Sequence, residues 1–101
     1  MDYVTERAHQ IFTNAHGGGV PTEGDIALYR MYAVLSFAKG GATTAEDVHD
    51  AWSAWIASTY PEHRSLKPFS ELTSDVKRMD DVFVTAIHRA SDTEAACGPA
   101  R

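Results

Sequence analysis

The chain has 101 residues, of which 44% are hydrophobic, so it can build one hydrophobic core but not two independent ones. Nine Lys and Arg residues stand against fourteen Asp and Glu residues, and the formal net charge of −5 disfavours binding to a nucleic-acid backbone. The single cysteine, Cys97, excludes an internal disulfide and a cysteine-based zinc site within one chain.

Apolar residues recur at helical spacing through the first part of the chain. The first pattern predicts a helix from Val4 to Ala15, with Asp2 as its cap and glycines 17–19 at its end. A second helix follows, with Thr22 as a cap. Its residues from Ile26 to Phe37 leave almost no polar face, so we expect this helix to be the central and most buried element.

A third helix is predicted after the glycines at 40 and 41. Thr44 and Asp47 have the spacing of a capping box, and one apolar stripe extends from Val48 to Ile56. The segment KGGATTAEDVHDAW also has the length and the glycine of a helix-turn-helix. As a DNA-binding element it would present acidic residues to the groove, so nucleic acid is not the expected partner.

The segment from Thr59 to Leu72 contains two prolines and no periodicity, which predicts an ordered loop. A fourth helix is expected from about Ser74. The residues from Ser91 to Arg101 are small and polar and are expected to be a disordered tail. We therefore predict a single domain over residues 1–90, an all-α four-helix fold with an ordered loop between helices three and four, and at most one short strand.

No pattern in the sequence indicates catalysis or a metal site. His16 and the glycines after it resemble the oxyanion-hole element of some esterases, but the chain has no matching GxSxG serine. His9 and His16 are two helical turns apart, roughly 10 Å, which is too far to chelate one ion. We predict no enzyme activity, no cofactor and no metal.

The chain also lacks the signals of export and membrane insertion. Its N-terminus has no secretory signal, and the longest apolar stretch, Met31 to Ala38, is much shorter than the roughly 20 residues of a membrane span. We expect a protein of the cytoplasm without a membrane partner.

Two blocks between residues 48 and 80 carry a family resemblance. The first is VHDAW at residues 48–52, and the second keeps every gap between His63, Leu66, Pro68, Phe69, Leu72, Lys77 and Asp80. Together they resemble the ryanodine-receptor repeat (RyR) domain. The Gly-Trp and Tyr-Gly pairs that this family places between its blocks are replaced here by ASTYPE. The N-terminal half is similar to small proteins of actinobacterial phages, so the expected compartment becomes the host bacterial cytoplasm.

The resemblance implies a non-enzymatic binding module that senses or sequesters a nucleotide-derived ligand in phage–host conflict. It assigns ligand binding to His49, Trp52, His63 and Lys77, with the indole stacked on a flat ring and the imidazole and ammonium groups near an anion. The same side chains could instead pack the loop onto its neighbouring helices. The alternative function is binding of a host protein through an apolar patch, and a homodimer is expected in either case.

Overall fold

The computed structural model describes residues 1–97, with side chains up to residue 92, and every regular element in that range is a helix. The elements are α1 (Tyr3–His16), α2 (Ile26–Ala38), η1 (Gly40–Ala42), α3 (Ala45–Ala57), η2 (Phe69–Glu71), α4 (Ser74–Arg78) and α5 (Asp81–Cys97). This confirms the predicted all-α, four-helix fold with a loop between the third and fourth helical regions. The described residues contain no strand.

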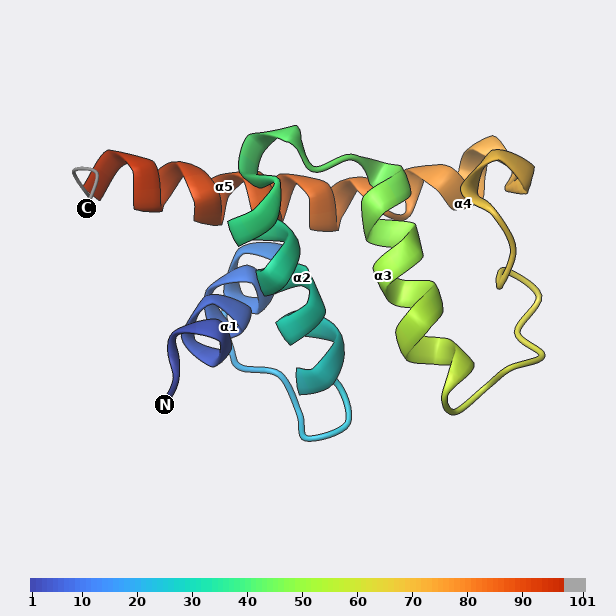
Figure 1. The fold of residues 1–101 in the computed structure, drawn as a ribbon, viewed down its shortest axis with the longest axis horizontal. Helices are drawn as coiled ribbons and strands as arrows, with labels where there is room; N and C mark the ends of the chain where they lie inside the picture. The colour runs from blue at the N-terminus through green and yellow to red at the C-terminus, as the bar shows by residue number, and fades with distance from the viewer. Residues whose placement is uncertain (98–101) are drawn as a thin grey trace.

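The helices are arranged along the long helix α5, which extends across the whole molecule (Figure 1). α1 and α2 pack together beside its middle, and α3 crosses nearer its N-terminal end. α2 contacts α1, α3 and α5, in agreement with its expected central position. The loop after α3 returns along that helix to α4, so residues 58–73 form one end of the molecule. No helix in the described part of the chain is both long and apolar enough to span a bilayer.

The core is formed by one apolar face of each long helix. Small residues allow the helix backbones to approach closely, and larger side chains fill the remaining space. Tyr32, Ile11, Ile87 and Val48 are the largest fully buried side chains. The other buried members are Ala8, Leu28, Tyr29, Ala33, Ala86 and Ala90.

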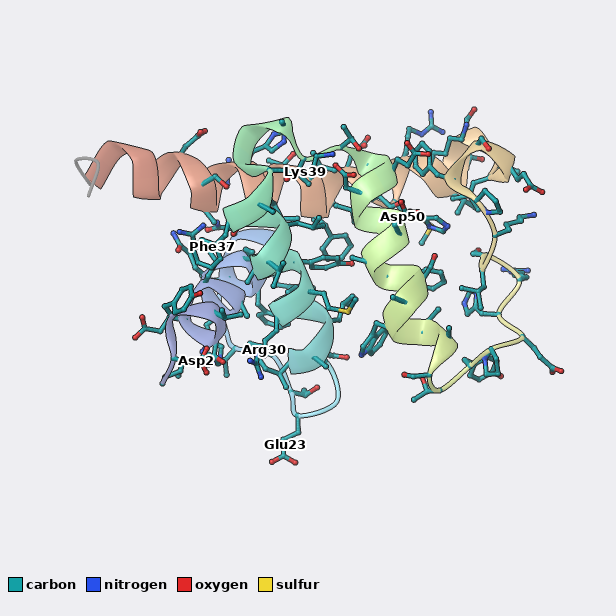
Figure 2. The ribbon with its side chains drawn as sticks, in the orientation of Figure 1. Asp2, Glu23, Arg30, Phe37, Lys39 and Asp50 are labelled. Atoms are coloured by element: carbon teal, nitrogen blue, oxygen red, sulfur yellow. The ribbon has the colours of Figure 1, made fainter. Side chains whose placement is uncertain are left out.

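Helix ends follow the predicted capping chemistry at two places and differ at a third. Asp2 accepts a hydrogen bond from the Thr5 N–H at the start of α1, and Thr44 forms a complete capping box with Asp47 at the start of α3. Thr22 was predicted as the cap of the second helix. Instead, the Thr22 hydroxyl accepts the Asp25 N–H in a turn that precedes α2. The Thr22 carbonyl accepts the N–H groups of Asp25 and Ile26 in the same turn. The turn projects from the molecule, with Glu23 at its tip (Figure 2).

The fourth helical region is divided at Met79 and Asp80, where the sequence predicts one continuous helix. The N–H groups of Met79 and Asp80 bond three residues back, which tightens and ends α4. The Asp80 carbonyl then accepts the N–H groups of Phe83 and Val84 and starts α5 in a new direction. The apolar periodicity is the same on both sides of the break, so it could not reveal the break.

The helix α5 extends to Cys97, beyond the point where the sequence predicts a disordered tail from Ser91. Within this helix the Ser91 hydroxyl donates to the Ile87 carbonyl at 3.0 Å, so its polar side chain is satisfied without leaving the helix. Residues 91–97 of the predicted tail thus belong to α5, and its last part, residues 98–101, lies outside the described residues.

Candidate ligand-binding site

A cavity of about 380 Å³ lies between α2, α3, the loop after α3, α4 and the start of α5. Its volume is at the lower end of the range of roughly 300–1,000 Å³ that is usual for small-molecule sites. Leu28, Val76 and Met79 provide apolar wall. The rings and polar groups that line it are those of Tyr32, His49, Trp52, His63, Asp80 and Phe83.

His49 fixes one side of this cavity. Its ring is 3% exposed, and its Nε2 lies 2.7 Å from the Lys67 carbonyl oxygen. Because a carbonyl can only accept, Nε2 carries the proton of the imidazole and donates it to Lys67. In the neutral ring Nδ1 is then an acceptor. This single bond ties α3 to the loop that follows it.

Trp52 lies between the two imidazoles. His49 is stacked on the indole at a centroid distance of 5.6 Å, and His63 meets it edge-on at 5.0 Å. The Ser65 N–H donates to His63 Nδ1 at 3.0 Å, so the proton of the neutral His63 ring is on Nε2. The loop after α3 therefore folds back onto that helix and brings residues of the two sequence blocks into contact.

Lys77 does not line the cavity. α4 turns its neighbours Val76, Met79 and Asp80 towards the cavity, while the Lys77 ammonium lies 5.2 Å from the centroid of the Phe69 ring. This is a cation–π contact that fastens α4 to the loop. Of the four residues predicted to bind ligand, the structure brings three together at the cavity and leaves Lys77 beside it.

Asp80 and Tyr32 are polar residues of the cavity that the sequence did not assign to a site. Among the described residues, neither the Asp80 carboxylate nor the Tyr32 hydroxyl has a hydrogen-bond partner, although Tyr32 is only 1% exposed. Burial raises the pKa of Asp80 above its usual 3.8, against the opposing effect of His49 and with a smaller contribution from Asp81. Burial likewise raises the pKa of Tyr32, with smaller contributions from Tyr29 and then from Asp80.

The sequence contained only partial signals for these two residues. Asp80 is the last position of the second block, and the structure places it in the lining of the cavity. Tyr32 lies in the apolar run of α2 and looks like an ordinary core residue. Only the break between α4 and α5 exposes both side chains to a common space.

A second hollow, between α2 and α3, is almost entirely apolar. Met31, Val34 and Leu35 form one side of it, and Asp47 and Asp50 stand at its border. Asp47 is already bound to Thr44 and to Lys39, whose Nζ lies 2.8 Å away. This hollow contains few groups that could orient a polar ligand, so it is the weaker candidate.

Two of the three remaining histidines, His16 and His88, make structural contacts. His16 Nε2 lies 2.8 Å from the Tyr29 hydroxyl, and His88 Nε2 lies 2.8 Å from the Thr43 carbonyl. Within the described residues, no group of three His, Cys, Asp or Glu side chains is arranged to hold a metal ion.

The cavity is part of a recognised family domain. Residues 2–92 match the family described as Domain of unknown function (DUF7701). The chain belongs to this family. Neither any curated protein nor any solved structure matches the chain. The match includes every residue that lines the cavity, from Leu28 to Phe83, so the cavity lies within the DUF7701 domain itself and not in an appended segment.

Proposed function

We propose that this DUF7701 domain is a non-enzymatic binding module for a small planar ligand derived from a nucleotide. The observation that carries the proposal is the convergence of His49, Trp52 and His63 on one cavity. Aromatic and imidazole rings provide flat apolar surface and directed hydrogen bonds, which is the combination that a heterocyclic ring requires. The resemblance of residues 48–80 to the RyR domain supports the same class of ligand.

Binding, rather than catalysis, is supported by the chemistry of the lining. His49 donates to a backbone carbonyl and His63 accepts from a backbone N–H, so each imidazole is held in one tautomer. The cavity offers no serine or cysteine nucleophile paired with a base, since its one hydroxyl-bearing serine, Ser65, has a backbone contact to His63 and no activating partner among the described residues. We propose that the module acts as a sensor or sink in a host bacterial cytoplasm.

Thermal unfolding with a panel of nucleosides, nucleotides, cyclic dinucleotides and ADP-ribose tests this function. A ligand at 100 times its Kd stabilises the folded state by about 2.7 kcal/mol, which would be visible as a rise in Tm of several degrees. Absence of stabilisation by every member of the panel would overturn the proposal.

The two tryptophans of α3 provide a matched pair of controls, because Trp52 lines the cavity and Trp55 does not. In the Trp55→Phe variant the only remaining tryptophan is Trp52, and its fluorescence should change on addition of a stabilising ligand. In the Trp52→Phe variant the remaining Trp55 should not respond. A response from Trp55 alone would place the ligand elsewhere.

Recognition of a host protein through an apolar patch is the second candidate function. Tyr3 is 70% exposed and its ring lies 5.2 Å from that of Phe37, which gives a small aromatic surface across α1 and α2. Tyr60 is also exposed, but it belongs to the segment after α3, which lies away from α1 and α2 (Figure 1), so it does not extend this surface. A pull-down comparing the wild type with Tyr3→Ser would test this candidate, and identical recoveries would reject it.

A further inference from the structure

The cavity has an uneven set of polar groups. Asp80 provides the one carboxylate among the residues that line it, and no Lys or Arg is part of the lining. A phosphate inside the cavity would therefore face a carboxylate and no permanent cation. The lining favours ligand groups that donate hydrogen bonds, and it disfavours anions.

The positions of the protons add a second constraint. The carboxylate of Asp80 can accept two hydrogen bonds side by side, and it has no partner among the described residues. The Nε2–H of His63 is a donor, since Nδ1 of the same ring accepts the Ser65 N–H. The Tyr32 hydroxyl, also without a partner in the described part of the chain, can donate or accept. Two adjacent acceptor oxygens and a donor thus face one space.

Unpaired polar groups in a partly buried cavity destabilise a protein unless a ligand or water satisfies them. The pKa of Asp80 is raised because its carboxylate is removed from water without receiving a hydrogen bond in exchange. A ligand with two neighbouring N–H groups would provide both missing bonds, and its ring could contact Trp52 and Phe83.

We infer that the cavity binds a planar nitrogen heterocycle whose edge carries two adjacent N–H donors beside a carbonyl acceptor, the pattern of guanine. Asp80 accepts both N–H groups, the His63 Nε2–H or the Tyr32 hydroxyl donates to the carbonyl, and Trp52 contacts the ring. The ribose and any phosphate remain outside the cavity, since its lining contains no Lys or Arg. This inference rests on the proposed function and names the ligand class for the same site.

The test is a comparison of nucleosides by isothermal titration with the full chain. We expect guanosine to bind at least tenfold more tightly than inosine, which lacks the exocyclic amino donor, and adenosine to bind more weakly still, because it lacks the N1–H and the carbonyl. Guanosine monophosphate should bind no more tightly than guanosine, since no Lys or Arg lines the cavity.

A change of ligand preference in the variant Asp80→Asn would be a more specific test than a loss of binding. The Asn amide offers one acceptor and one donor, so the preferred edge should become that of xanthine, with one N–H donor next to a carbonyl. We expect this variant to bind xanthosine more tightly than guanosine and the wild type to show the reverse order. The Asp80 contact that starts α5 is made by its backbone carbonyl, which Asn keeps, so α5 should form normally, and circular dichroism would verify this.

The outcomes separate the ligand class from the proposed function. Equal affinity for guanosine, inosine and adenosine would overturn the inference that the cavity recognises the edge of guanine. The proposed function, binding of planar rings, would still stand. Binding of tetramethylammonium in place of any nucleoside would also overturn it, because the aromatic rings and the carboxylate would then form a site for an organic cation. If no compound of either kind bound, both the inference and the proposed function would fail.

Discussion

The Nε2 of His49 lies 2.7 Å from the carbonyl oxygen of Lys67, and this contact joins the middle of α3 to the loop that returns towards α4. The two residues are 18 positions apart in the sequence, so the bond closes a long loop over the side of α3. Phe69 lies in the same region, with its ring 6.1 Å from that of His49. The cavity exists because this loop is held there.

Replacement of His49 should therefore release the loop. His49→Ala removes a buried ring together with its hydrogen bond, and we expect a loss of about 2–4 kcal/mol in the free energy of unfolding. Urea unfolding measures it. Lys67→Ala is the matched control: it keeps the backbone acceptor and removes only an exposed side chain, so the change should stay within about 0.5 kcal/mol. Equal losses in the two variants would show that the His49 bond does not hold the loop.

Asp80 should reduce stability at neutral pH. Its folded-state pKa is raised above 3.8, so between 3.8 and the raised value the folded state binds more protons than the unfolded state, and stability falls as the pH rises through that window. Above the window the cost of burying the charge is present in full. We expect Asp80→Asn to be more stable than the wild type at pH 7, because the uncharged amide avoids the cost of removing the carboxylate from water.

The pH dependence identifies the cause of this gain. Below pH 3.8 the Asp80 carboxyl is neutral in both states, so the advantage of Asp80→Asn should disappear there. Asp50→Asn, at an exposed position on α3, should show no comparable gain at pH 7. Thermal unfolding of the three proteins between pH 3 and pH 8 gives the comparison. A constant difference across that range would mean that the charge of Asp80 is not responsible.

The fold was more predictable from the sequence than the site, for physical reasons. Helical periodicity and caps report local backbone preferences, so the three helices before the loop were placed within a few residues, and the capping box of Thr44 was found in full. The break at Asp80 depends on how α5 packs against α1 and α2, which no local pattern encodes. Without that break, Asp80 and Tyr32 could not be recognised as neighbours.

The predicted site residues likewise divide into those that the sequence placed at the cavity and one that it did not place correctly. His49, Trp52 and His63 meet because the loop folds back, as the spacing of the two blocks suggests. Lys77 is assigned by its place in the second block and by its charge. On the helix α4, however, it is the neighbouring Val76 that lines the cavity, together with Asp80 just after the helix. Residue type in a motif predicts possible chemistry, whereas orientation requires the tertiary structure.

The capping box at the start of α3 should make a measurable contribution to stability. The Thr44 hydroxyl accepts the Asp47 N–H, and the Asp47 carboxylate accepts the Thr44 N–H at 2.9 Å. Thr44→Ala should cost about 1 kcal/mol, and Thr44→Ser, which keeps the acceptor oxygen, should cost much less. Chemical denaturation of both variants decides the matter. Equal costs would show that the loss comes from the Thr44 methyl group and not from the cap.

The Asp47 carboxylate of the same capping box should make the free energy of unfolding depend on pH. Its contact with Lys39, followed by the Thr44 backbone bond, lowers the pKa of Asp47 below 3.8. The stabilisation is therefore complete above 3.8 and is lost as the pH falls through the lower folded-state pKa. The difference in unfolding free energy between the wild type and Asp47→Asn should shrink in that acidic window. If it were the same at pH 2 and pH 7, the ionised form of Asp47 would not be the stabilising species.

The junction between α2 and α3 depends on one glycine of a pair. Gly40 has a φ of +51°, in the left-handed region, whereas its neighbour Gly41 has no positive φ, and a Cβ at Gly41 would meet no atom within 4 Å. A Cβ at Gly40 would contact Ser91 at an ordinary 3.8 Å, so the expected penalty is one of backbone strain and not of collision. We expect Gly40→Ala to cost about 1–2 kcal/mol. Gly41→Ala should be neutral or slightly stabilising, because alanine restricts the unfolded chain more than glycine does. Unfolding of the two variants by urea under the same conditions tests the difference, and equal stabilities would show that the turn can adopt a right-handed conformation at residue 40 without cost.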